Sequence, residues 1–254
     1  MLLFENKNYR DPNISPAGPE PASLSEDIKQ RNAELVAQYQ ASLSGASAQD
    51  ILAWAAEHAG PTAITLSMEN TVLAELGARY FPAADFLFLD TGYHFEDTLL
   101  VANAVELRYP DQKLVRATPV LTRAEQDDTY GPNLYQRNPE ACCRMRKVEP
   151  LQRTLGNYQA WVTGIRRADG PTRAHAPAIE LDKAGRLKIS PLVTWSLEET
   201  ERFAEENELI YHPLTKQGYP SIGCATCTLP VAPGQDPRSG RWAGTNKTEC
   251  GLHT

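Results

Sequence analysis

The sequence predicts an α/β fold with a mostly parallel central sheet flanked by helices. Short apolar runs typical of buried strands alternate along the chain with longer segments whose apolar residues recur at helical spacing. Such alternation favours a parallel sheet, because parallel strands need a crossover connection between them. The length of 254 residues and the hydrophobic content of 41% fit a globular chain with a substantial core.

The expected elements follow in chain order. Ser25 and Ser47 are suitable N-caps for two helices, and Ser196 with Glu199 forms a capping box that begins a third. Pro139 is a good first residue for a helix that Pro150 kinks or splits. Strands are expected at 63–66, 86–89, 113–117 and 159–164, a hairpin at 179–181 and 187–189, and helices at 71–80, about 95–108 and 196 to about 207.

The two ends differ in composition from the middle. Residues 1–22 contain four prolines among polar residues, and we expect a flexible arm there. A strap docked on the body or on a partner subunit is the alternative. Residues 23–230 show no internal linker and are expected to form a single domain. Residues 231–254 are rich in Gly, Pro and Arg, which predicts a mobile tail.

Composition narrows the class of function. The net charge of −7 and the pI of about 5.3 disfavour nucleic-acid binding. No apolar run approaches the roughly 20 residues of a membrane-spanning helix, and the first ten residues do not resemble a signal peptide. We therefore expect a cytoplasmic protein with no membrane contact, in a compartment where cysteines stay reduced. Oligomeric state is left open, with a homo-oligomer as one option.

Four of the five cysteines are grouped in a way that indicates a metal site. Cys142 and Cys143 are adjacent, and Cys224 and Cys227 form a C-x-x-C loop that can aim two thiolates at one centre. Adjacent side chains on a helix diverge by about 100°, so both reach one centre only if it is broad. An iron–sulfur cluster is therefore favoured over a zinc ion. The alternative is a set of unrelated buried cysteines with a redox-active C-x-x-C.

The fifth cysteine, Cys250, is left free for chemistry close to the chain end. Cysteine attacks as a thiolate, a form that nearby cations favour, and Lys247 and His253 lie three residues to either side. A carboxyl-terminal flap can close over a substrate and then swing out to another protein. The alternative is a disordered tail with an incidental cysteine.

An anion site is expected beyond the carboxyl ends of the strands, where ligands bind in parallel sheets. The loops there are 67–70, 90–92 and the one after Gly164. Arginine forks bind phosphate and sulfate oxygens at two points. Taken singly, each cation is better explained as a solvated surface charge. The basic residues in question come from separate loops: Lys147, Arg166, Arg167, Arg173, Arg238 and Arg241.

Together these motifs resemble the bacterial assimilatory sulfonucleotide reductases, specifically the iron–sulfur adenylyl-sulfate (APS) reductases. The resemblance covers roughly residues 50–253. The matching stretches are Leu89-Asp90-Thr91-Gly92-Tyr93-His94, Cys142-Cys143 with Arg146-Lys147, Thr163-Gly164-Ile165-Arg166-Arg167, Tyr219-Pro220-Ser221-Ile222-Gly223-Cys224 with Cys227, Arg238-Ser239-Gly240-Arg241-Trp242 and Lys247-Thr248-Glu249-Cys250-Gly251-Leu252-His253.

The resemblance implies a Rossmann-like fold of the adenine nucleotide α-hydrolase type and an enzyme of sulfate assimilation and cysteine biosynthesis. It implies a 4Fe–4S cluster on Cys142, Cys143, Cys224 and Cys227. Cys250 would attack the sulfur of APS, release AMP and carry an S-sulfonate, which thioredoxin or a glutaredoxin-like donor converts to sulfite. The cluster would have a structural and electrostatic role. Substrate is expected at Ser67, Asp90, Thr91, Gly92, Lys147, Arg166, Arg173, Arg238, Arg241 and His253.

One stretch departs from the family pattern. Many relatives have Ser-Gly-Gly or Ser-Gly-Ala in the phosphate loop, whereas this chain has Met68 after Ser67. Reduction of the 3′-phosphorylated substrate PAPS, or of both substrates, is the nearest alternative, although PAPS reductases generally lack the cluster cysteines. Alternatives from other classes are a zinc-bearing nucleotide-binding module and an ATP-pyrophosphatase-type adenylating enzyme, neither of which needs a terminal thiol.

Overall fold

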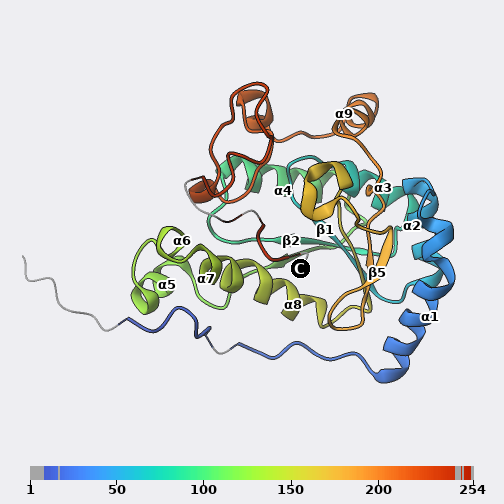
Figure 1. The fold of residues 1–254 in the computed structure, drawn as a ribbon, viewed down its shortest axis with the longest axis horizontal. Coiled ribbons are helices and arrows are strands. Elements are labelled where there is room, and N and C mark those ends of the chain that lie inside the picture. The colour runs from blue at the N-terminus through green and yellow to red at the C-terminus, as the bar shows by residue number, and fades with distance from the viewer. Residues whose placement is uncertain (1–8, 17, 244–246, 248, 253–254) are drawn as a thin grey trace, which may run out of the picture.

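The computed structural model describes residues 9–16, 18–243, 247 and 249–252. In these residues a sheet lies at the centre of the molecule, between helices (Figure 1). It has six strands in the order β3-β2-β1-β4-β6-β5. All neighbouring strands are parallel except the hairpin β5–β6. This confirms the predicted α/β class. The strands are β1 (Thr62–Leu66), β2 (Asp85–Leu89), β3 (Leu114–Ala117), β4 (Ala160–Val162), β5 (Ile179–Leu181) and β6 (Leu187–Ile189).

Helices cover both faces of the sheet. The α-helices are α1 (Glu26–Leu43), α2 (Ala48–His58), α3 (Val72–Tyr80), α4 (Glu96–Arg108), α5 (Arg123–Tyr130), α6 (Leu134–Arg137), α7 (Pro139–Cys143), α8 (Glu149–Leu155) and α9 (Leu197–Glu206). A π-helical segment, η1 (Arg144–Val148), joins α7 to α8, and short 3₁₀ turns follow at η2 (Arg167–Asp169), η3 (Pro171–Arg173), η4 (Pro213–Gln217) and η5 (Ala225–Cys227).

Alternating side chains of the strands divide the core into two clusters. Ile64, Phe86 and Val162 pack with α2, α3 and α4 on one face of the sheet. Leu87 and Trp161 point to the other face, where α8 covers them. Successive residues of a strand face opposite sides, so a sheet buried on both sides reads as a continuous apolar run. This is why the central strands could be recognised from short apolar segments.

The predicted caps are confirmed. The side chains of Ser25, Ser47 and Ser196 each accept a hydrogen bond from the backbone N–H three residues later. Helices α5 and α6 were not expected, although the Thr122–Glu125 capping box is a sequence signal for α5. The helical run that begins at Pro139 is divided into α7, η1 and α8, and Pro150 is the second residue of α8. This fits the prediction that Pro150 splits the helix, because proline removes one backbone donor.

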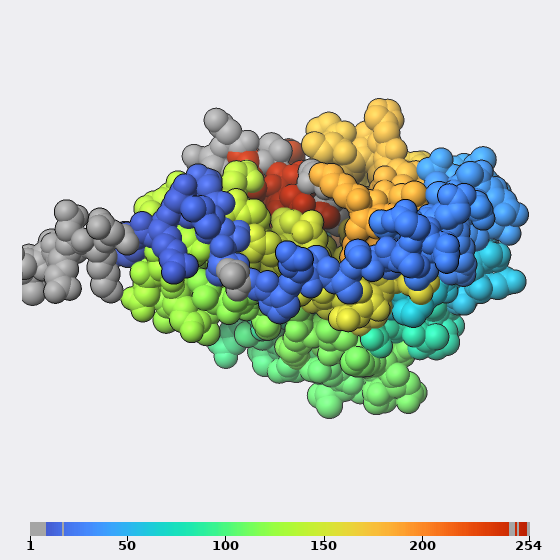
Figure 2. Space-filling view, turned by 90° about the horizontal axis from the view of Figure 1, so that it is seen from below, coloured from blue at the N-terminus to red at the C-terminus, as the bar shows by residue number. Residues whose placement is uncertain are grey.

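The described part of the N-terminal arm lies along the body (Figure 2). The backbone of Arg10 donates to the carbonyl of Thr129 at 2.9 Å, and the Tyr130 hydroxyl donates to the carbonyl of Ile14 at 2.8 Å. Arg144 donates to the carbonyl of Pro12. These contacts contradict an arm with little packing and fit the alternative of a strap docked on the body. Its mobility in solution stays a prediction.

Beyond Tyr211 the described chain forms only turns, as the loss of periodicity predicted. These turns are nevertheless fixed by backbone hydrogen bonds: Leu229 donates to Gly240, Val231 to Gly218 and Trp242 to Cys227. No described helix combines the length and apolar character needed to cross a membrane.

Asn32 is a buried polar residue that ties α1 to the sheet. Its amide donates to the carbonyls of Gly185 at 2.9 Å and Gln159 at 3.2 Å. Replacement by alanine should lower the free energy of unfolding by about 1–2 kcal/mol, because a buried carbonyl loses its partner. Urea unfolding measures the change. The exposed Gln30 on the same helix is the matched control, and Gln30→Ala should shift stability by less than about 0.5 kcal/mol. Equal losses would contradict this role for Asn32.

Candidate active site

The loops that follow β1 and β4 border a cavity of about 550 Å³ at the carboxyl ends of the strands. Apolar side chains line part of it, and basic side chains from the second half of the chain line another part. The predicted site residues that it brings together are Ser67, Thr91, Lys147, Arg166, Arg173, Arg238, Arg241 and Cys250. The site therefore combines distant segments around one thiol. His253 lies outside the described residues.

Asp90 and Gly92 are not in the lining of this cavity. The Asp90 carboxylate instead accepts a hydrogen bond from the backbone N–H of Gly92 at 2.9 Å. Gly92 has φ of +70°, and a Cβ there would lie 2.9 Å from a guanidinium nitrogen of Arg146. These two residues shape the turn that presents Thr91, so direct contact with substrate stays a prediction for them.

In the loop after β1, a residue other than glycine has the left-handed backbone conformation. Met68 has φ of +63° and is 1% exposed. The left-handed conformation costs a residue with a side chain about 1 kcal/mol, whereas burial of a methionine side chain stabilises by about 1.5–3 kcal/mol. The loop therefore adopts a turn that usually favours glycine, and burial of the Met68 side chain stabilises it.

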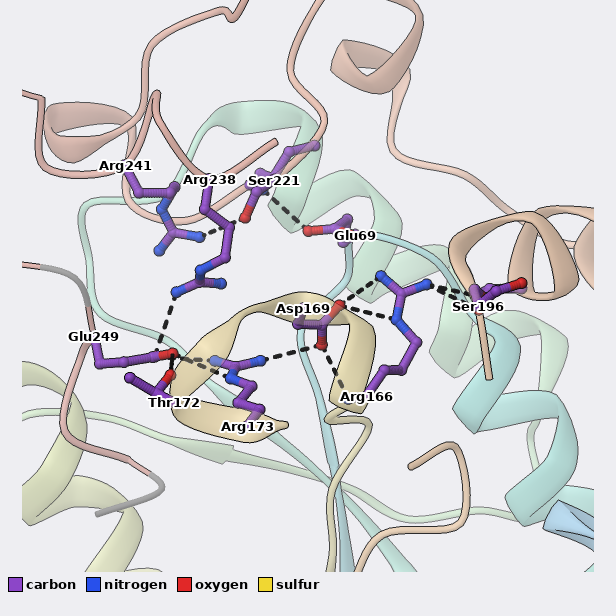
Figure 3. A network of polar contacts seen from close by, with 12 residues as sticks. Glu69, Arg166, Asp169, Thr172, Arg173, Ser196, Ser221, Arg238, Arg241 and Glu249 are labelled. Atoms are coloured by element: carbon purple, nitrogen blue, oxygen red, sulfur yellow. Dashed lines mark hydrogen bonds and ion pairs between the residues drawn. The ribbon is translucent and has the colours of Figure 1, made fainter. Parts of the chain in front are cut away.

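Five charged side chains form a continuous chain of ion pairs at the cavity, in the order Arg166, Asp169, Arg173, Glu249 and Arg238 (Figure 3). Arg166 donates to Asp169 through Nε at 3.0 Å and Nη2 at 2.7 Å. Arg173 donates to the other oxygen of Asp169 at 3.2 Å and to Glu249 at 3.0 and 3.1 Å. Arg166 uses its remaining donors on Thr200 and the carbonyl of Ser196, so it is held firmly in place.

Arg238 and Arg241 enter the cavity from the C-terminal turns. Arg238 donates to Glu249 at 3.3 Å. Arg241 donates to the Ser221 hydroxyl at 3.1 Å and lies over the Trp242 ring, 4.8 Å from its centroid. A Cβ at Gly223 would come within 2.2 Å of the Arg241 guanidinium, so only glycine leaves room for this arginine.

The four grouped cysteines line a second, smaller cavity. Cys142, Cys143 and Cys224 are buried, Cys227 is half-buried, and all four are free thiols. Among the described residues no group of three or more Cys, His, Asp or Glu side chains fits a single metal ion. Burial raises the pKa of Cys142 to about 12, with the neighbouring thiols adding to the shift. The four thiols thus line one small cavity, although they come from two segments about 80 residues apart in the sequence.

The π-helical segment η1 begins directly after Cys143. A π turn is wider than an α turn, and such segments are frequent at functional sites. It carries Arg146 and Lys147, both buried. Arg146 donates to the carbonyl of Thr91 and to Gln126, and lies 5.0 Å from the centroid of the Tyr93 ring. The segment therefore joins the paired cysteines to the turn after β2.

Lys147 lines both cavities and is 8% exposed. Burial works to lower its pKa, but the thiols of Cys224, Cys250 and Cys143 outweigh this effect and the pKa is raised. The ammonium group therefore stays charged between the four-cysteine cavity and Cys250. The Lys247 ammonium group pairs with the Glu140 carboxylate at 2.5 Å and lies 5.7 Å from the centroid of the Trp242 ring, so its charge does not act on Cys250 alone.

The sequence did not indicate that three acidic residues and Arg146 contribute to the site. Asp169 and Glu249 hold arginines in the cavity wall, and the Glu69 carboxylate accepts from the backbone N–H of Ile222 at 3.1 Å. The spacing Arg166-x-x-Asp169-x-x-x-Arg173 does indicate that Asp169 could pair with both arginines. Nothing local points to Glu249, whose partners lie far away in the sequence.

Glu69 makes the stability of the site depend on pH. Burial raises its pKa above 4.5, despite the Ile222 N–H and the nearby arginines. A raised pKa gives stability that is complete below the unfolded value and is lost as pH rises through the folded value. Glu69→Gln should therefore become more stable relative to wild type as pH rises from about 4.5. Urea unfolding over pH 4.5–7.5 measures the difference, with exposed Glu57→Gln as control. A difference that is constant with pH would contradict the assignment.

Known proteins share both the sequence and the fold. The family described as "Phosphoadenosine phosphosulfate reductase domain" matches residues 62–230. The chain is 50% identical over 222 residues to adenosine 5′-phosphosulfate reductase of Mycolicibacterium smegmatis, covering 87% of this chain and 94% of the relative. It is 48% identical over 232 residues to the enzyme of that name from Rhodococcus opacus, with the same coverage.

Among solved structures, phosphoadenylyl-sulfate (PAPS) reductase from Candida auris in a phosphate complex is similar, with a TM-score of 0.63 and 28% identity over 82% of this chain and 98% of that chain. Candida glabrata FMN adenylyltransferase shares the fold alone, with a TM-score of 0.53 and 17% identity over 84% and 75% of the two chains. These likenesses confirm the Rossmann-like class. The chain belongs to the sulfonucleotide (APS/PAPS) reductases, a family of oxidoreductases acting on sulfur, as its motifs had indicated.

Proposed function

We propose that this chain reduces adenosine 5′-phosphosulfate to sulfite and AMP through an S-sulfonate on Cys250. The observation that carries the proposal is the position of Cys250, which lines the same cavity as the loops after β1 and β4 and four arginines. The relatives named adenosine 5′-phosphosulfate reductase support the choice of substrate.

The reaction needs two displacements. The Cys250 thiolate attacks the sulfur, a Cys–sulfur bond forms, and the sulfur–oxygen bond to phosphate breaks with its electron pair leaving on AMP. A thiolate of thioredoxin, or of a glutaredoxin-like donor, then attacks the Cys250 sulfur and releases sulfite. The donor's second thiol resolves the mixed disulfide, so two thiols become one disulfide.

The residues around the thiol suit this chemistry. Lys147, Arg173 and Arg241 line the same cavity as Cys250, and their positive charges suit the negative charge that develops on the leaving phosphate. Fixed cations in a water-poor site stabilise such charge more than they would in water. Apolar Leu73 and Leu192 line the same cavity and offer a surface for the adenine ring.

We propose that the four grouped cysteines hold a 4Fe–4S cluster. All four free thiols line the same cavity, and their spacing resembles that of the iron–sulfur branch of the family. Binding must remove their protons, because burial raises the pKa of Cys142 and Cys143 above the ordinary thiol value. When bound, the cluster supplies fixed negative charge beside Lys147. The chain's own contribution is to keep that ammonium group buried and pointed at both cavities.

We also propose how the chain is divided and in which compartment it works. Residues 23–230 form a single α/β domain, residues 1–22 form an arm whose described part docks on that domain, and residues 231–254 form a tail that moves to present Cys250. The family match ends at residue 230, which supports the second boundary. We place the enzyme in the cytoplasm, where thioredoxin keeps thiols reduced.

Labelling tests the nucleophile directly. Wild-type protein incubated anaerobically with ³⁵S-labelled APS and no thioredoxin should retain label on a non-reducing gel, because Cys250 keeps the sulfonate. Cys250→Ser should retain none, and thioredoxin should release the label from wild type. The measurement is the radioactivity of each band. Absence of label on folded, brown wild-type protein would overturn the mechanism. Label from PAPS, and not from APS, would assign the 3′-phosphorylated substrate.

Iron content tests the cluster independently of activity. Wild-type protein should contain about four iron atoms and four acid-labile sulfides per chain. Cys143→Ser should lose most of this iron and the visible absorbance, because a buried ligand is removed. Cys250→Ser is the matched control and should keep both. Stoichiometric zinc without sulfide in wild type would replace the cluster by a zinc site.

A further inference from the structure

Glu249 is the residue immediately before the proposed nucleophile, and its carboxylate is fully engaged by the cavity wall (Figure 3). Oε1 accepts from Nε of Arg173 and from the Thr172 hydroxyl, each at 3.1 Å. Oε2 accepts from Nη2 of Arg173 at 3.0 Å and from Arg238 at 3.3 Å. Its pKa is lowered, because these partners outweigh the effect of burial, so Glu249 is ionised at neutral pH.

These donors form a complete oxyanion site. A two-point fork from one arginine, a second guanidinium and a hydroxyl are the groups that sulfate and phosphate oxygens prefer. The side chains of Arg173, Arg238 and Glu249 are only 13%, 22% and 19% exposed. Thr172 is exposed, but both arginines are mostly buried, so a carboxylate and a substrate oxyanion cannot use the same donors together.

Arg173 does not depend on Glu249 for its position. Its Nη1 donates to Asp169 at 3.2 Å, and Asp169 is itself fixed by Arg166. If the carboxylate leaves, the fork formed by Nε and Nη2 therefore stays in place with its donors available. The site is thus prepared to exchange one anion for another.

We propose that Glu249 is an internal competitor for the tetrahedral oxyanion of the substrate. The carboxylate occupies Thr172, Arg173 and Arg238 in the empty enzyme, and the phosphosulfate group of the substrate displaces it. Because Glu249 and Cys250 are adjacent, this exchange also moves the thiol from its resting position. The inference rests on the proposed function for the identity of the oxyanion, but not on turnover.

Binding of ADP to the purified holoenzyme tests the exchange. ADP carries a second tetrahedral oxyanion in place of the sulfonate, and a thiol does not cleave it. Glu249→Gln removes the competing charge and keeps the side-chain size, so it should bind ADP about tenfold more tightly in calorimetric titration. Adenosine lacks the oxyanions and should bind both proteins equally. Glu249→Ala should behave as Glu249→Gln.

Glu140→Gln is the matched control, because it removes the other ion pair of the tail, to Lys247, and leaves Thr172, Arg173 and Arg238 engaged. It should not change ADP affinity. Unchanged or weaker ADP binding by both Glu249 variants would overturn the proposal. A similar gain for adenosine or in Glu140→Gln would also overturn it, since loosening of the tail would then be the cause. Tighter ADP binding by the Glu249 variants, with no ³⁵S labelling of wild type, would support the exchange and contradict the proposed reductase reaction.

Discussion

The site depends on a buried positive charge among thiols. Lys147 lies between the four-cysteine cavity and the cavity of Cys250, and thiols on both sides keep it protonated. An isolated ammonium group in such a place would lose its proton. The packing of η1 against the turn after β2 fixes this lysine, so the helix that carries the paired cysteines and the loop that presents Thr91 must be assembled together.

Much of this arrangement follows from local sequence. The central strands are apolar on both faces, so short runs such as the one around Phe86 could be located without knowledge of their neighbours. Serine caps located three helix starts within a residue or two. The cysteine spacing and the family motifs identified the thiols, and the structure places all five on two adjoining cavities that share Lys147.

What could not be predicted depends on contacts between distant segments. Glu249 meets Arg173 across 76 residues, and Glu69 meets the backbone of Ile222 across 153. No periodicity or spacing encodes such a pair. The hydrogen bond from the Gly92 N–H to the Asp90 carboxylate is local, whereas contact of Asp90 with substrate stays a prediction. Helix α5 was missed although its capping box is visible, because the polar helix has little apolar pattern.

The π-helical segment determines the direction in which the paired cysteines face relative to α8. A π-helical turn contains about one residue more than an α-helical turn, because its hydrogen bonds join residues five apart. Deleting one residue within Arg144–Val148 would restore a continuous α-helix and turn everything before it by about 100° relative to α8. Cys142 and Cys143 would then face away from Cys224. The number of residues in this segment therefore determines whether the paired cysteines and Cys224 line the same cavity.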